Sequence, residues 1–238
     1  MNRFNYFLGK AIQYFGYDLR RYPNGEDLLV KNEFTSKNIN TVFDVGANVG
    51  QYVSYLRNIL GYKNLIVSFE PLLGEYKILL EKSKNDKNWQ IVNVACGSQN
   101  EFVKINRAAN SQSSSILQML DKHLDAAPNS KFISKEEIEV VRLDDIYKKY
   151  CSEMDNVFLK IDVQGYEMHV LEGGSKFLPN CKGIQLELSL KPLYENEKLY
   201  FEMIHTVENL GFHLHTIYPG FRDERNNELL QIDAIFFR

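Results

Sequence analysis

The most informative part of the chain is Asp44-Val45-Gly46-Ala47-Asn48-Val49-Gly50-Gln51-Tyr52, which directly follows the run Thr41-Val42-Phe43. An apolar run that stops at a small-residue turn and continues as a helical pattern predicts a strand, a turn and a helix. This geometry brings backbone N–H groups and a carboxylate up to a small ligand. The dinucleotide fingerprint G-x-G-x-x-G is not met, because the glycines are Gly46 and Gly50. Taken alone, such a turn can also serve tight packing, and that interpretation stays open here.

Short apolar runs alternate with helical patterns along most of the chain, which predicts a parallel sheet with helices on both faces. Seven strands are expected, at Thr41–Val45, Leu65–Phe69, Gln90–Val94, Val157–Ile161, Gly183–Leu188, His213–Tyr218 and Ile232–Phe237. Helices are expected between them at Gln51–Leu60, Leu73–Lys84, Tyr166–Phe177 and Leu199–Leu210. The last two strands leave no room for a crossover helix, so they should pair antiparallel.

One region interrupts the alternation. Phe102–Asn106 and Ile138–Arg142 resemble strands, and the polar stretch between them holds a short helical piece at Ile116–Leu124. Long irregular insertions tend to be binding loops or lids, and a surface loop without a role is the alternative. The expected organisation is a helical, aromatic extension over residues 1–40 and a domain over residues 41–238 with an insertion at about 108–137.

The composition of the 238 residues is that of an ordinary globular protein. A net charge of −3, with 44% hydrophobic and 25% charged residues, gives no electrostatic footprint for nucleic acid. The three cysteines are far apart and lack a C-x-x-C pairing, so a reducing cytoplasm fits best. No apolar run approaches the ~18 residues needed to cross a bilayer. The aromatic spacing in residues 4–15 favours a core- or partner-facing helix, and peripheral membrane contact and an oligomer remain alternatives.

Several predicted strands end in residues suited to a nucleoside ligand. Glu70 follows the second strand, one βαβ unit after Asp44, where an acid accepts both hydroxyls of a ribose. Pro71 adjoins it, and small groups such as Ala95 after the third strand can flank an adenine. A carboxylate before a glycine-rich turn suits a ligand with a cationic amino-acid end better than one with a pyrophosphate. S-adenosylmethionine is such a ligand.

Two further carboxylates end adjacent strands. Asp162 follows Val157–Ile161 at the mouth of the expected site, and Glu187 lies near the end of the next strand. Asp162 can contact the methionine end of the cofactor, accept a hydroxyl proton or, with Glu187, bind a hard divalent cation, and the sequence commits to no metal. A structural role for Glu187, as a helix cap or a partner of Lys191, is the alternative. Among the histidines, only His123 merits testing as a base.

Ordered motifs give the chain a family resemblance. They are Phe43-Asp44-Val45-Gly46-Ala47-Asn48-Val49-Gly50-Gln51-Tyr52, Phe69-Glu70-Pro71, Val141-Arg142-Leu143-Asp144-Asp145 and Leu159-Lys160-Ile161-Asp162-Val163-Gln164-Gly165-Tyr166-Glu167. Together they resemble the FkbM family of S-adenosylmethionine-dependent methyltransferases, over about residues 41–238. The resemblance implies the α/β, class I methyltransferase (Rossmann-like) fold, a seven-stranded, mostly parallel sheet with an antiparallel last strand.

The same resemblance implies O-methylation of a hydroxyl group, often on a sugar of a cell-surface polysaccharide or on a secondary metabolite, so the expected acceptor is a glycan or a small molecule. Its cofactor-binding positions are Asp44, Gly46, Asn48, Gly50 and Glu70, with Ser114 and Ser115 as site-lining residues. In such a reaction the enzyme supplies proximity and a base, here Asp162 assisted by Glu187. Two alternatives stay open: a nicotinamide-dependent oxidoreductase, disfavoured by the missing third glycine, and a non-catalytic methyltransferase-like binding protein.

Overall fold

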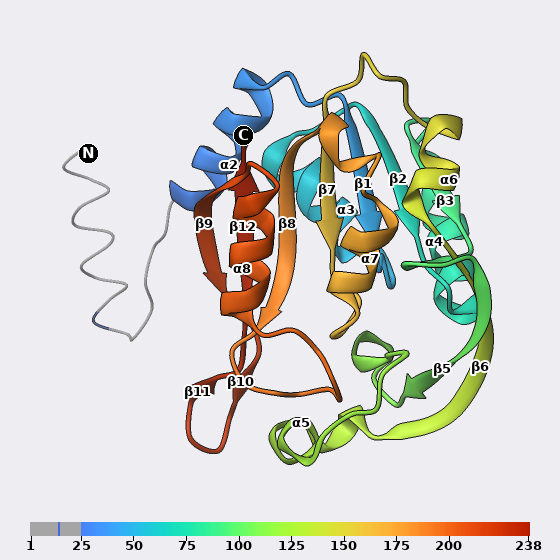
Figure 1. The fold of residues 1–238 in the computed structure, drawn as a ribbon, viewed down its shortest axis with the longest axis vertical. Helices are drawn as coiled ribbons and strands as arrows, with labels where there is room; N and C mark the ends of the chain where they lie inside the picture. The colour runs from blue at the N-terminus through green and yellow to red at the C-terminus, as the bar shows by residue number, and fades with distance from the viewer. Residues whose placement is uncertain (1–13, 15–24) are drawn as a thin grey trace.

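The computed structural model describes Tyr14 and residues 25–238, which fold around a seven-stranded sheet of order β3-β2-β1-β7-β8-β12-β9 (Figure 1). Its strands are β1 (Thr41–Val45), β2 (Leu65–Phe69), β3 (Trp89–Val92), β7 (Val157–Ile161), β8 (Cys181–Ser189), β9 (His213–Pro219) and β12 (Gln231–Phe237). β12 lies antiparallel to both of its neighbours, β8 and β9, and the remaining pairs are parallel. The predicted fold class, strand count and antiparallel last strand are confirmed.

Helices cover both faces of the sheet. One face carries α6 (Leu143–Ile146), α7 (Glu167–Gly173) and α8 (Tyr200–Asn209), which lie in front of the strands in Figure 1. The other face of the sheet carries α2 (Gly25–Ser36) and α3 (Gln51–Tyr55). α3 continues as the π-helical turn η1 (Leu56–Leu60). α4 (Leu73–Ser83) leads into β3. The predicted helix Tyr166–Phe177 ends earlier, at Gly173, where a Cβ would lie 1.8 Å from the carbonyl oxygen of Gly97.

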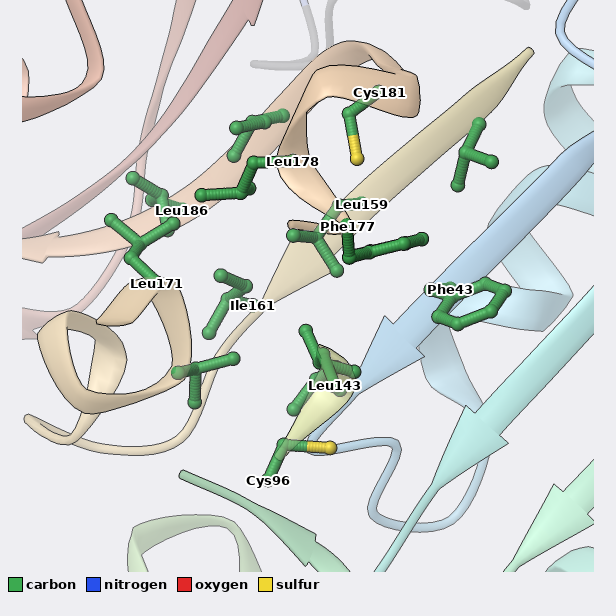
Figure 2. Close-up of a cluster of buried hydrophobic side chains, with 14 of the residues drawn as sticks. Phe43, Cys96, Leu143, Leu159, Ile161, Leu171, Phe177, Leu178, Cys181 and Leu186 are labelled. Atoms are coloured by element: carbon green, nitrogen blue, oxygen red, sulfur yellow. The ribbon is translucent and has the colours of Figure 1, made fainter. Parts of the chain in front are cut away.

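The period-two pattern of the strands divides the core between the two faces. In β1, Phe43 and Val45 join the cluster under α6 and α7, whereas Val42 joins the cluster under α2 and α3. Figure 2 shows the first cluster, in which Phe43 meets Phe177, with 4.8 Å between ring centroids. Each such side chain contributes about 1.5–3 kcal/mol through burial, so the strand interiors fix the register that positions the site.

Residues 95–141, which contain the predicted insertion, form a second, three-stranded sheet of order β4-β6-β5. Its elements are β4 (Ala95–Cys96), β5 (Glu101–Ala108), η2 (Ser111–Ser113), α5 (Asp121–Ala126), η3 (Pro128–Ser130) and β6 (Phe132–Val141). The predicted helix at Ile116–Leu124 is wrong in its first half, because the Asn106 side-chain amide donates to the carbonyl oxygens of Ser115 (3.1 Å) and Leu117 (3.0 Å). These bonds hold an extended segment, and the helix begins only at Asp121.

A small hairpin of β10 (Arg222–Asp223) and β11 (Glu228–Leu229) extends the connection between β9 and β12. It lies beside the insertion in Figure 1, and Lys122 of α5 approaches Glu228 at 2.6 Å. The last two strands of the large sheet therefore pair antiparallel as expected, with this hairpin between them.

The predicted extension over residues 1–40 is described only in part. Its aromatic segment, residues 4–15, lies outside the described residues except for Tyr14. The part that forms α2 packs on the sheet, with Phe34 centred 4.7 Å from Phe158 of β7. No helix within residues 25–238 is long and apolar enough to cross a bilayer.

Candidate active site

A cavity of about 450 Å³ opens at the carboxyl edge of the large sheet, where the turns after β1, β2 and β7 meet the end of β8. Ligands of open α/β sheets bind at this edge, outside the strand ends. The residues predicted from the sequence that line the cavity are Gly46, Asn48, Glu70, Pro71, Ala95, Ser114, Asp162 and Glu187. Two predicted cofactor residues, Asp44 and Gly50, lie behind this lining.

A row of polar side chains crosses the sheet beneath the cavity. Asp44 of β1 is in register with Ser68 of β2 and with Lys160 of β7. Lys160 is in turn in register with Gln185 of β8. Residues in matched register project from the same face of a sheet, so the four side chains lie side by side on the face covered by α2 and α3. The Ser68 hydroxyl donates to Asp44 Oδ2 at 3.0 Å.

Lys160 connects the buried Asp44 to the cavity. Its Nζ lies 3.4 Å from Asp44 Oδ1 and 3.4 Å from Asp162 Oδ2, and it donates to the carbonyl oxygen of Gly46 at 3.0 Å. Burial alone would lower the pKa of Lys160, but the carboxylates of Asp162, Asp44 and Asp233 raise it above its ordinary value. Burial raises the pKa of Asp44, and Lys160 opposes that shift. Lys160 therefore links the buried Asp44 to Asp162, which lines the cavity.

The turn after β1 requires glycine at its first position. Gly46 has a φ of 77°, and a Cβ there would lie 1.8 Å from the carbonyl oxygen of Asp162. Gly50 has a φ of 87°, and a Cβ there would meet the Trp89 ring at 3.0 Å. Gly46 thus allows β1 and β7 to approach closely at the cavity, whereas Gly50 serves packing at the start of α3.

Glu70 closes the other side of this turn. Its Oε2 accepts the backbone N–H of Asn48 at 2.7 Å, and its Oε1 accepts that of Leu72 at 2.9 Å. Burial raises the pKa of Glu70 to about 8, against the opposing effect of these two N–H donors. Each carboxylate oxygen still has a lone pair free for a hydroxyl donor. This geometry suits a ribose.

Asp162, Glu187 and Asp233 bring three carboxylates to the opposite end of the lining. Glu187 Oε2 accepts from the side-chain amides of Gln164 (2.6 Å) and Gln231 (2.8 Å). Its partners are therefore two amides, and not Lys191 or a helix end, the alternatives considered from the sequence. Burial raises the pKa of Glu187 well above its ordinary value, and the charges of Asp162 and Asp233 add to the shift. Within the described residues, no group of three or more His, Cys, Asp or Glu side chains is arranged to hold a metal ion.

The insertion contributes Ser111, Gln112, Ser114 and Ile116 to the cavity lining, whereas Ser115, also predicted to line the site, is not part of it. Ser111 accepts from the Asn48 side chain at 3.0 Å, and Ser115 donates to the Gln164 carbonyl oxygen at 2.7 Å. Ser114 lines the cavity, as predicted. His123 lies away from this lining, where it pairs with the Ser130 hydroxyl at 3.2 Å, and burial lowers its pKa to about 4. A histidine packed there is not positioned to act as the base.

Several lining residues carried no role in the sequence analysis: Tyr52, Tyr55, Lys160, Gln164, Gln185 and Asp233. Tyr52 and Tyr55 stack with 5.9 Å between ring centroids, and Lys160 Nζ lies 5.7 Å from the centre of the Tyr52 ring. One signal was available in the sequence, because a lysine at the centre of the apolar strand Val157–Ile161 must be paired once that strand is buried.

The sheet order and the cavity at its carboxyl edge define the protein as a member of the class I methyltransferase fold. The methyltransferase FkbM domain matches residues 44–214, and the chain belongs to that family.

Solved structures similar to this chain include three methyltransferases. One is an S-adenosylmethionine-dependent methyltransferase from Aquifex aeolicus (13% identity, 88% of each chain covered, TM-score 0.45). The second is a precorrin-6y C5,15-methyltransferase from Geobacter metallireducens (11% identity, 91% of this chain and 89% of that chain, TM-score 0.45). The third is an rRNA methylase from Streptococcus thermophilus (8% identity, 88% and 94%, TM-score 0.45). A search of curated proteins found no match. The assignment therefore rests on the family match and the site itself.

Proposed function

We propose that this protein is an S-adenosylmethionine-dependent O-methyltransferase that acts on a hydroxyl group of a sugar, in a cell-surface polysaccharide or another glycan. The observation that carries the proposal is the placement of Asp162 and Glu187 in the same cavity as Glu70 and the glycine turn. One cavity thereby offers a site for a nucleoside and, beside it, carboxylates able to take a proton from a hydroxyl.

The lining fits the cofactor at three places. Glu70 keeps one lone pair on each carboxylate oxygen for the ribose hydroxyls, and Pro71 and Ala95 offer small apolar surface beside it. Gly46 and Asn48 line the same cavity and would hold the amino-acid end. A volume of about 450 Å³ lies within the range of small-molecule sites. When bound, the cofactor supplies an electrophilic methyl group on a sulfonium ion.

The chain itself orients the acceptor and holds its proton. Asp162 receives the hydroxyl proton, and Lys160 Nζ lies 3.4 Å from Asp162 Oδ2. The stacked Tyr52 and Tyr55 offer an apolar face with polar edges, and Gln185 adds an amide, a combination suited to a sugar ring. We include a cytoplasmic location in the proposal, which the three free, buried cysteines suit.

The test combines cofactor binding with methyl transfer to candidate glycans, read by mass spectrometry as the gain of one methylene unit. Asp162→Asn should lower turnover by about 10²–10⁴-fold, since the amide cannot accept the proton, while calorimetry shows cofactor affinity within about threefold of the wild type. The matched control is Asp125→Asn, an exposed carboxylate on α5 outside the cavity lining, which should leave turnover unchanged. Full activity of Asp162→Asn would overturn the assignment of the base.

Two outcomes would replace the function as a whole. Stabilisation by a nicotinamide cofactor, with none by S-adenosylmethionine, in a thermal-shift comparison would indicate an oxidoreductase. Binding of S-adenosylmethionine without turnover on any hydroxylated acceptor would indicate a binding protein. Methylation of a small metabolite and of no glycan would keep the reaction and change the acceptor.

A further inference from the structure

The side chain of Gln164 connects the two carboxylates of the proposed active site. Its Nε2 donates to Asp162 Oδ1 at 3.1 Å and to Glu187 Oε2 at 2.6 Å. We propose, on the basis of the proposed function, that Gln164 is a positioning residue whose amide holds Asp162 and Glu187 as an oriented pair, and that Tyr194 fixes the orientation of that amide.

The backbone at this point directs the side chain into the cavity. Gln164 has a φ of 56°, in the left-handed region that non-glycine residues seldom adopt, and Gly165 follows with a φ of 92°. Glu167 Oε1 holds this turn by accepting the backbone N–H groups of Val163 (3.0 Å) and Gly165 (3.2 Å). A strained backbone that persists under such support commonly marks a functional position.

The hydrogen bonds determine which way the amide faces. The end near Asp162 and Glu187 meets two carboxylates, so it must be the NH₂ group, because an amide oxygen there would face only acceptors. The oxygen end then faces Tyr194, whose hydroxyl donates to Gln164 Oε1 at 2.8 Å. The Tyr194 hydroxyl also lies 3.1 Å from the Ser113 carbonyl oxygen, so its single proton is shared between that oxygen and Gln164 Oε1, which is nearer. Tyr194 is fully buried, so its hydroxyl has only these protein partners, and the two carboxyl groups at the other end determine the orientation of the amide.

The arrangement also couples the insertion to the pair of carboxylates. Ser115 donates to the backbone carbonyl oxygen of Gln164 at 2.7 Å, and Ser113 lies against the Tyr194 hydroxyl. The insertion thus contacts the backbone of Gln164 directly and its side-chain amide through Tyr194.

Removal of the Gln164 amide should change the protonation of the two carboxyl groups, because they are close together and their charged forms repel each other. The two carboxylates would lose the donor they share and face each other with less compensation, which favours their protonated forms. The other charged and titratable groups around the pair are unchanged by the substitutions below: Lys160 and Asp44 on the β7 and β1 side, Asp233 on β12, Glu167 on α7, and Glu197.

The experiment compares wild type, Gln164→Met, Tyr194→Phe and the surface control Gln90→Met on the exposed side of β3. Gln164→Met should lower kcat on the order of 10²-fold, the cost of misplacing a reacting group by about an ångström, without changing cofactor affinity. In the plot of kcat/KM against pH, the acidic limb should move to higher pH by about one unit. Tyr194→Phe should shift the limb in the same direction by less, and Gln90→Met should change nothing.

A second readout does not depend on any acceptor. Carbon-13 NMR of labelled Asp and Glu carboxyl groups should show two carboxyl titrations moving to higher pH in Gln164→Met. The inference would be overturned if folded Gln164→Met showed the same carboxyl titrations and the same acidic limb of the pH profile as the wild type. If Gln164→Met fails to fold, unchanged titrations and an unchanged acidic limb in Tyr194→Phe overturn it. Shifted titrations in a protein that methylates no hydroxyl would support the role of Gln164 and refute the proposed function instead.

Discussion

Lys160 provides the sharpest test of how this site is held together. Asp44 has no exposed surface, and its Oδ1 has no hydrogen-bond partner in the described structure, so the ammonium 3.4 Å away is the main compensation for its charge. Lys160→Met keeps the length of the side chain and removes that charge. Breaking a buried ion pair from one side typically costs about 3–5 kcal/mol, because it leaves an uncompensated buried charge. We expect Lys160→Met to lose free energy of unfolding in this range at pH 8.

The loss should depend on pH with a definite sign. Without Lys160, burial raises the folded-state pKa of Asp44 still further above its unfolded value of about 3.9. The folded variant then binds a proton that the unfolded chain does not bind, so its stability rises as the pH falls. The deficit relative to wild type should shrink on going from pH 8 towards pH 5, by at most about 1.4 kcal/mol per pH unit.

Urea unfolding at several pH values measures both effects. The double variant Asp44→Asn/Lys160→Met removes both charges and should recover much of the lost stability, since two neutral side chains leave no buried ion. Lys63→Met, an exposed lysine before β2, should stay within about 0.5 kcal/mol of wild type. The reasoning is refuted if Lys160→Met is as stable as wild type, or if its deficit is the same at pH 5 and pH 8.

Two further substitutions probe the cofactor side of the cavity. Gly46→Ala should cost several kcal/mol of stability or prevent folding, because its Cβ would lie 1.8 Å from the Asp162 carbonyl oxygen. Gly25→Ala is the control, since a Cβ at Gly25 meets nothing within 4 Å. Equal melting temperatures for the two variants would contradict this reasoning. Cofactor affinity should rise up to about tenfold per pH unit towards pH 8, since ribose hydroxyls favour the ionised form of Glu70, whose pKa in the free protein is about 8. Calorimetry in buffers of different ionisation enthalpy should detect proton release when the cofactor binds. Glu70→Gln should abolish the pH dependence of cofactor affinity. An affinity that does not change with pH in the wild type would count against ribose binding by Glu70.

The strands and the residues just beyond their ends could be predicted from the sequence, because burial imposes a readable pattern. Thr41–Val45 is apolar except for Thr41 and Asp44, and Val157–Ile161 is apolar except for Lys160. The observed bounds of both strands match the predicted ones. Parallel strands bring their carboxyl ends to one edge, so Glu70, Asp162 and Glu187 could be placed at one cavity without knowledge of any contact.

What could not be predicted depends on contacts between distant parts of the chain. The insertion lacks a helix at Ile116 because Asn106, ten residues earlier, takes its carbonyl groups as acceptors. The role of Gln164 depends on Tyr194, 30 residues later, and on Glu187 of the neighbouring strand. Local propensity contains no information on either contact.

The position of Asp44 could be predicted from the sequence, whereas its neighbours could not. Its position before a glycine turn suggests direct ligand binding, and the alternation within β1 turns its side chain into the layer under α3, where it is fully buried and is not part of the cavity lining. In that layer the register with β7 places Lys160 beside it, and Lys160 reaches Asp162 in the cavity. The local motif places the acid, but only the register of distant strands shows that Lys160 stands between Asp44 and Asp162.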